Sequence, residues 1–148
     1  IRGVYAATLR TVIPAYERED LVWKRMYSIL AEKHLNVTFA QPQHARAYFY
    51  DEGFKEKDVD VEIAIEAVGC YEDVEDIRFR QLKDEAVASV TFTGDYSQIS
   101  EVCMAITMWI KENGYELDGA NFCIYHKGWG QCDNPEEFVT EICFPIRK

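Results

Sequence analysis

Two tyrosine and glutamate pairs are the residues of this sequence best suited to hold a ligand. Tyr50 precedes Glu62 by 12 residues, and Tyr125 precedes Glu141 by 16 residues. A carboxylate surrounded by aromatic rings is costly to keep charged, so it either takes up a proton or waits for a cation. Aromatic rings nearby add a cation–π attraction of about 0.5–2 kcal/mol each. The spacing therefore predicts the same cation-attracting pair in each half of the chain.

The elements that must position these pairs indicate a duplication. Residues 4–11 read like residues 87–94, and each stretch is followed by an amphipathic helix, an aromatic strand and an acidic strand. A repeated strand–helix–strand–strand unit predicts an α+β fold, in which an antiparallel sheet carries two helices on one face. We expect a single domain over 1–148, with repeat 1 at about 1–70, repeat 2 at about 75–148, and a ligand cleft at the pseudo-twofold join.

Apolar periodicity locates the individual elements. Val22, Met26 and Ile29 lie at helical spacing and predict a helix at about 18–34 with one buried stripe. Asp95 and Gln98 resemble a capping box, which predicts a second helix that ends at about 113–114. Strands are expected at about 3–11, 43–50, 58–68, 77–82, 86–93, 121–126 and 138–146.

Alternation within the strands predicts which side chains share a face. In the strand at 58–68, Val61 and Ile63 alternate with Glu62, so Glu62 should lie on the face away from the helix. By the same argument, Tyr125 and Glu141 are expected together on that face. The alternative is that both glutamates lie on a solvated face and that the tyrosines are ordinary cross-strand packing.

Composition narrows the class of protein. The chain is 48% hydrophobic and 14% aromatic, which are globular values. It lacks an apolar run of the roughly 18 residues that a membrane span needs, so no membrane partner is expected. A formal charge of -10 and a pI near 4.7 would repel a phosphate backbone, so direct contact with nucleic acid is not expected either. The acidity either creates a field that gathers cations or only keeps the protein dispersed in solution.

The cysteines favour a reducing compartment. There are five of them, an odd number without CxxC or Cys/His zinc spacing, which predicts a cytoplasmic protein with reduced thiols and without a metal or cofactor. Cys123 and His126 are three residues apart on one expected strand and so point to opposite faces, which is the wrong geometry for a nucleophile and its base. We expect no catalytic residue. The start at Ile1, with neither Met nor a signal peptide, indicates a fragment of a longer chain.

Four segments in order carry a family resemblance: VASVTFTGDY at 87–96, WIKENG at 109–114, IY at 124–125 and TEICFPI at 140–146. With the duplicated half before them, they resemble the GyrI-like small-molecule-binding domain, which is also the effector-binding domain of MerR-type and AraC-type bacterial transcription regulators. The resemblance implies two strand–helix–strand–strand repeats and a cleft that in several relatives takes amphipathic, often cationic, aromatic compounds.

The resemblance also implies the function and the site. We expect a multidrug-type sensor domain whose partners are a hydrophobic or cationic small molecule and a DNA-binding domain in the same full-length chain. The alternatives are a stand-alone hydrolase of electrophilic small molecules and a gyrase-protecting protein. Many relatives place a cleft Glu where this sequence has Cys123, and a protonated thiol carries no charge, which argues against glutamate-dependent hydrolysis there. The expected ligand-binding residues are Tyr5, Tyr48, Tyr50, Glu62, Cys123, Tyr125, Trp129 and Glu141.

Overall fold

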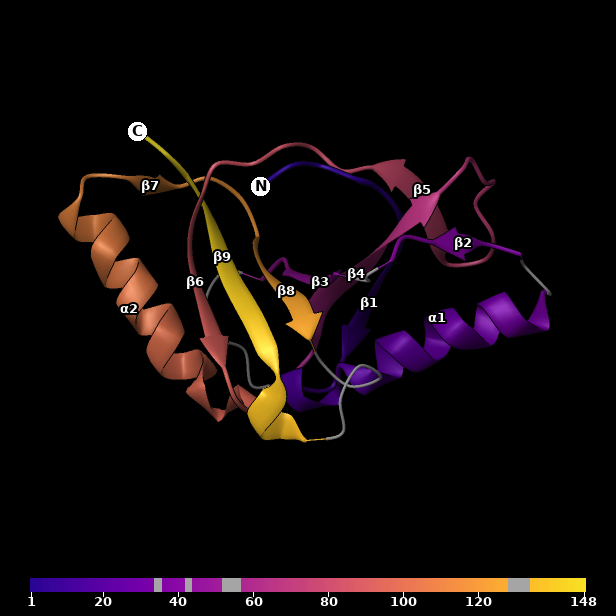
Figure 1. Ribbon diagram of the computed structural model, residues 1–148, viewed down its shortest axis with the longest axis horizontal. Coiled ribbons are helices and arrows are strands. Elements are labelled where there is room, and N and C mark those ends of the chain that lie inside the picture. The colour runs from indigo at the N-terminus through magenta and orange to yellow at the C-terminus, as the bar shows by residue number, and fades with distance from the viewer. Residues whose placement is uncertain (34–35, 42–43, 52–56, 128–133) are drawn as a thin grey trace. The chain divides into compact units, whose positions relative to one another are not determined.

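Two compact units make up the protein in the computed structural model, which describes residues 1–33, 36–41, 44–51, 57–127 and 134–148. One unit is Gly3–Lys83, and the other is Ile1–Arg2 with Asp84–Lys148. Each unit contains an α-helix and antiparallel strands, which confirms the expected α+β class (Figure 1). Trp129, expected in the ligand site, lies outside the described residues.

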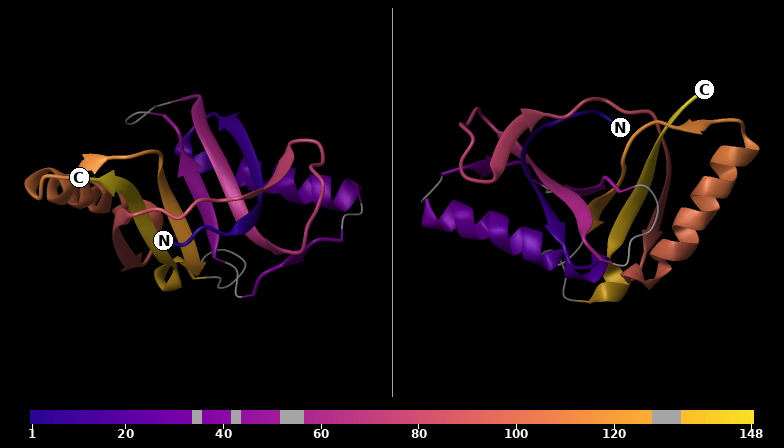
Figure 2. Two further views of the ribbon diagram at one scale, coloured as in Figure 1. Left: turned by 90° about the horizontal axis from the view of Figure 1, so that it is seen from above. Right: turned by 180° about the vertical axis from the view of Figure 1, so that it is seen from behind.

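The first unit, Gly3–Lys83, is a helix packed on an antiparallel sheet. Its sheet has the strand order β5-β1-β4-β3, and the short strand β2 pairs with β4. Its elements are β1 (Tyr5–Ile13), η1 (Tyr16–Arg18), α1 (Asp20–Glu32), β2 (Thr38–Phe39), β3 (Ala45–Phe49), β4 (Val59–Val68) and β5 (Ile77–Gln81). Figure 2 shows α1 lying against the strands of this unit.

One face of this sheet forms a core with α1. Leu9 of β1 pairs with Ile63 of β4, and both side chains are at most 1% exposed. The predicted helical stripe is buried as well: Val22, Met26 and Ile29 are all at most 1% exposed. Burying apolar side chains from both elements is the main stabilising contribution here. Because side chains alternate along a strand, the residues between the core positions lie on the opposite face.

The opposite face of the same sheet is rich in charged and hydroxyl groups. Arg10 of β1 pairs with Glu62 of β4, and Glu62 pairs in turn with Tyr48 of β3. On the outer side of β1, Ala6 pairs with Arg80 of β5. Directly paired residues share a face, so these strands present Arg80, Arg10, Glu62 and Tyr48 on one side.

The second unit repeats the order strand, helix, strand, strand. Its sheet has the strand order β8-β9-β6, and the short strand β7 pairs with β9. The stripe of α2 is buried at Ile106 and Ile110. Its elements are β6 (Val87–Thr93), η2 (Tyr96–Gln98), α2 (Ile99–Glu112), β7 (Glu116–Leu117), β8 (Asn121–Lys127), η3 (Pro135–Glu137) and β9 (Val139–Arg147).

The entry into α2 differs from the expected capping box. Asp95 does act as a cap, but it accepts from the backbone N–H of Ser97 at 3.1 Å and so begins the short helix η2. The Gln98 side chain donates back to the carbonyl of Thr93 at 3.0 Å instead of accepting from the cap. Gly94 has φ +122°, a conformation that side chains disfavour, which is why the turn between β6 and η2 carries glycine.

Candidate functional site

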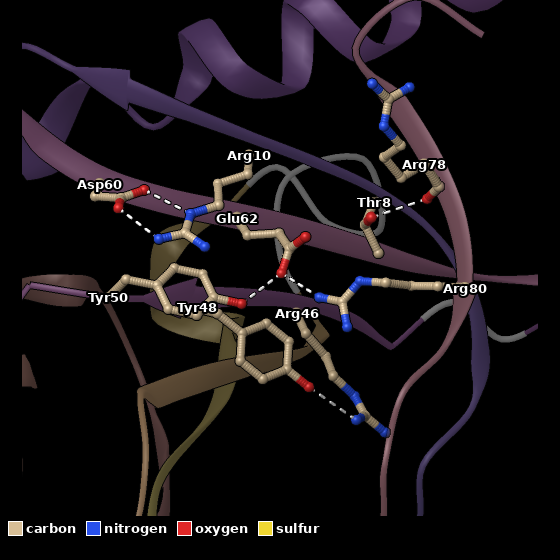
Figure 3. A network of polar contacts seen from close by, with 9 residues as sticks. All are labelled: Thr8, Arg10, Arg46, Tyr48, Tyr50, Asp60, Glu62, Arg78 and Arg80. Carbon is tan, nitrogen blue, oxygen red and sulfur yellow. Dashed lines mark hydrogen bonds and ion pairs between the residues drawn. The ribbon is translucent and has the colours of Figure 1, made fainter. Parts of the chain in front are cut away.

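Glu62 is the centre of the candidate site in the first unit. Its side chain is only 8% exposed, and its Oε1 accepts a hydrogen bond from the Tyr50 hydroxyl at 2.5 Å. The same oxygen accepts from Nη2 of Arg80, with which Glu62 forms an ion pair (Figure 3). Among the described residues, these two are the hydrogen-bond donors to the carboxylate. A buried carboxylate without such partners would be strongly destabilising, so the contacts with Tyr50 and Arg80 offset the cost of burying Glu62.

Tyr50 is held as a neutral donor. Burial, followed by the hydrogen bond to Glu62, raises the pKa of the Tyr50 hydroxyl well above its ordinary value. Its ring is covered by the guanidinium of Arg10, whose Cζ lies 3.8 Å from the ring centroid. Arg10 is itself fixed by two hydrogen bonds to Asp60, at 3.0 and 2.7 Å. The arrangement makes Tyr50 a binding group and a poor proton acceptor.

Tyr48 extends the aromatic surface beside Glu62. Its hydroxyl accepts a hydrogen bond from Nη1 of Arg46 at 3.2 Å, and both residues are buried, at 7% and 8% exposure. Tyr48 is paired directly with Glu62, so its ring stands on the same face. Of the expected site residues, Tyr48, Tyr50 and Glu62 are therefore brought together.

Tyr5 is not part of this group. It precedes Ala6, so it lies on the face of β1 opposite Arg10 and Glu62. Its ring stacks on Phe79 at 6.4 Å between centroids, and its hydroxyl accepts from the backbone N–H of Tyr71 at 3.1 Å. Strand parity therefore puts Tyr5 on the other side of the sheet from Glu62, and its expected role in ligand binding stays a prediction.

Glu141 has a comparable but chemically different surround in the second unit. Its Oε1 lies 2.9 Å from Nε2 of His126, its Oε2 accepts from the Ser89 hydroxyl at 2.8 Å, and its side chain is 15% exposed. Burial by itself would raise the pKa of Glu141, but the hydrogen bonds from His126 and Ser89 outweigh burial and lower it. Glu141 is therefore ionised at neutral pH.

The expected pairing of Tyr125 with Glu141 is wrong. In the ladder between β8 and β9, Ile124 pairs with Glu141 and Tyr125 with Thr140, so Tyr125 lies on the opposite face from Glu141. Its ring instead packs edge-on against the ring of Tyr96 in η2, with 5.9 Å between the ring centroids. Cys123 shares that face, is 5% exposed and is paired with Ile142. Its thiol therefore does not stand beside Glu141.

The ladders identify His126 as the counterpart of Tyr50. Tyr48 pairs with Glu62 as Ile124 pairs with Glu141, and two residues further along each strand stand Tyr50 and His126. Both then bond to the glutamate of their own unit. The sequence comparison was shifted by one residue in the second unit. The strand there has a register irregularity between Tyr125 and Lys127, which residue counting does not reveal.

Four polar partners were missed by the sequence analysis. Arg80 had a usable signal, since Arg78 and Arg80 are two residues apart in an expected strand and must share a face. The contacts of Arg10, Ser89 and His126 depend on strand register, for which the sequence has no such signal.

Two further searches of the described residues bear on the class of site. Within those residues, no three His, Cys, Asp or Glu side chains are grouped so that they could hold a metal ion. Neither α1 nor α2, the α-helices of the described ranges, combines the length and the apolar character that a membrane crossing requires.

Apart from the two-residue strands β2 and β7 and the additional strand β5 of the first unit, both units have the order strand, helix, strand and strand, which defines a duplicated α+β fold. The GyrI-like small molecule binding domain matches residues 20–147, and the chain belongs to this GyrI-like family. A comparison with curated protein sequences found no match.

Solved structures show the same fold. The crystal structure of the EcmrR C-terminal domain is 21% identical, with a TM-score of 0.90 over 100% of this chain and 94% of that one. The structure of EcmrR in its complex with DNA is also 21% identical, with a TM-score of 0.91 over the whole of this chain. This chain spans only 55% of that EcmrR chain.

More distant structures share the fold as well. SAV2435 bound to tetraphenylphosphonium is 12% identical, with a TM-score of 0.61 over 99% of this chain and 90% of that one. A hydrolase from Listeria innocua is also 12% identical, with a TM-score of 0.59 over 99% and 90%.

Proposed function

We propose that this chain is the effector-binding domain of a cytoplasmic bacterial transcription regulator and that it binds amphipathic aromatic compounds, cations among them. The observation that carries the proposal is the buried carboxylate of Glu62 between Tyr48 and Tyr50, in a chain of the GyrI-like family. Tyrosine rings offer apolar area and a cation–π surface, and the carboxylate offers charge in a desolvated place.

The regulatory part of the proposal rests on the likeness to EcmrR. This chain spans 55% of the EcmrR chain seen in complex with DNA. By analogy, a DNA-binding domain would belong to the same full-length protein as this chain. A ligand that binds one arrangement of the effector domain more tightly would shift its population, and the attached domain would report that shift. The location of the ligand cleft at the join of the repeats stays a prediction.

Calorimetric titration with tetraphenylphosphonium tests the binding proposal. We expect saturable binding to the unmodified chain, and we expect Glu62→Gln to weaken it about tenfold or more because the ligand then loses its charge partner. Glu66→Gln is the matched control, since Glu66 is on the same strand and face but is exposed. No binding of any hydrophobic cation, or equal effects of the two variants, would contradict the proposal.

Two pKa shifts argue against the alternative that this chain is a hydrolase. The raised pKa of Tyr50 keeps its hydroxyl protonated at neutral pH, and the lowered pKa of Glu141 makes its carboxylate a weaker base. Turnover of an electrophilic test substrate that disappears in a Glu141→Gln variant would nevertheless establish hydrolysis. A gyrase-protecting role would be favoured by capture of gyrase that does not depend on any small molecule.

A further inference from the structure

Two arginines of the protein already contact the carboxylate and the aromatic ring with which the candidate site would attract a cation. Arg80 forms an ion pair with the carboxylate of Glu62, and Arg10 lies 3.8 Å above the ring of Tyr50. Figure 3 shows both guanidinium groups reaching the Tyr50 and Glu62 pair from different strands. An incoming cation therefore meets a carboxylate and a ring that are already in use.

The two arginines are held very differently. Arg10 is anchored through two hydrogen bonds to Asp60. These bonds are the main reason why the pKa of Arg10 is raised. Arg80 has a side chain that is 45% exposed, and among the described residues Glu62 is its side-chain hydrogen-bond partner. Its long flexible stem can therefore move the charge into water at the loss of a single ion pair. Arg80 is the displaceable member.

We propose that Arg80 is a built-in competitor for the ligand: a bound cation takes its place on Glu62 while the Arg80 side chain moves into solvent. This inference rests on the proposed binding of cations at Glu62. A carboxylate that is 8% exposed is too costly to leave with Tyr50 alone, so the exchange is one cation for another. Arginine stays protonated at any accessible pH, so protonation does not release it.

The exchange acts as a filter on ligand size. A small cation gains from Glu62 no more than Arg80 already supplies, so it has nothing with which to drive the displacement. A large aromatic cation also buries apolar surface against the half-buried ring of Tyr50, and that burial tips the exchange in its favour. The competitor thus makes the site selective for bulky hydrophobic cations over small ones such as tetraethylammonium.

The test is calorimetric titration of tetraphenylphosphonium and tetraethylammonium into the unmodified chain and Arg80→Met, in which methionine keeps an apolar stem but not the charge. We expect Arg80→Met to bind tetraphenylphosphonium about tenfold more tightly, and to bind tetraethylammonium measurably. Arg78→Met is the matched control, because Arg78 is exposed on the same strand and face but donates to the carbonyl of Glu75. It should change either affinity by less than about twofold, since it leaves Glu62 paired.

Arg80→Gln keeps the test decisive if Arg80→Met is poorly folded. Glutamine can still donate a hydrogen bond to Glu62 but carries no charge, so the carboxylate keeps a polar partner and the variant should show the same gain in affinity. Glu62→Gln combined with Arg80→Met removes both charges and should lack the gain. If the unmodified chain binds tetraphenylphosphonium through Glu62 but Arg80→Met binds it equally or more weakly, the competitor is refuted and cation binding stands. If neither the unmodified chain nor Arg80→Met binds a cation, both the competitor role of Arg80 and the proposed function are refuted. A loss of benzoate binding in Arg80→Met would instead make Arg80 a group that binds anions.

Discussion

Glu62 and Glu141 carry the same charge but are held by partners of different chemistry. Tyr50 donates to Glu62 from a hydroxyl whose pKa is raised, so that contact persists across the physiological pH range. Glu141 is instead contacted by Nε2 of the His126 imidazole, at 2.9 Å from its Oε1. The two units therefore hold equivalent carboxylates through a phenol hydroxyl in one case and an imidazole ring in the other.

At the residue scale, Glu141→Gln should destabilise the protein at neutral pH and have little effect in acid. The pKa of Glu141 is lowered in the folded state, so its contribution is present above the unfolded pKa and is lost as pH falls through the folded one. We expect a loss of about 1–2 kcal/mol in the free energy of unfolding at neutral pH, because hydrogen bonds to a charged group are removed.

Urea denaturation of both proteins between about pH 7 and pH 3 measures this difference. Glu137→Gln is the control, since Glu137 is exposed on η3. A difference between Glu141→Gln and the unmodified chain that is constant over this range would contradict the assigned role of Glu141.

Strand register determined which side-chain contacts could be predicted from the sequence. The contact of Tyr50 with Glu62 followed from parity within two strands whose pairing is regular. Tyr125 was misplaced because the sequence does not determine the register between β8 and β9, and an error of one residue moves a side chain to the other face. Arg80 was overlooked although strand alternation alone placed it beside Arg78.

At the scale of elements, α1 is expected to owe its stability to packing more than to its surface charges. Met26→Ala removes a side chain that is 0% exposed and should lower the free energy of unfolding by about 2–5 kcal/mol. Lys24→Ala removes only an ion pair with Asp20 on the same helix, and it should cost far less because both side chains are exposed and screened by water. Chemical denaturation followed by circular dichroism gives both values. Equal losses in the two variants would refute this account of the helix.

The long elements were predictable and the short ones were not. Both helices and the seven expected strands are present, because periods of 3.6 and 2 repeat often enough to be recognised over 5–14 residues. The strands β2 and β7 are two residues long, too short to show any period. The expected capping box at the start of α2 was wrong for a related reason. A cap motif in the sequence does not distinguish an α-helix from a 3-10 turn that precedes it, and Asp95 caps the 3-10 helix η2.

At the scale of the whole molecule, charge decides what the chain binds by itself. The formal charge of -10 sets up a field that repels nucleic acid. Two of the arginines on the charged face of the first unit do not offset it locally: Arg80 is paired with Glu62 and Arg10 with Asp60. Those guanidinium groups are engaged with carboxylates of the protein, which weakens their attraction for phosphate.

We therefore expect this chain alone to leave duplex DNA unbound at about 0.15 M salt, the ionic strength at which non-specific contacts are already weak. Fluorescence anisotropy of a labelled duplex, titrated with the chain to about 100 μM, measures this, because non-specific DNA binding has dissociation constants of about 1–100 μM. The same titration with the full-length protein should show binding, supplied by the attached domain that the proposed function requires. Binding by this chain alone that weakens steeply with added salt would mean that a basic surface of the chain reaches phosphate, and the division between a sensing part and a DNA-binding part would have to be abandoned.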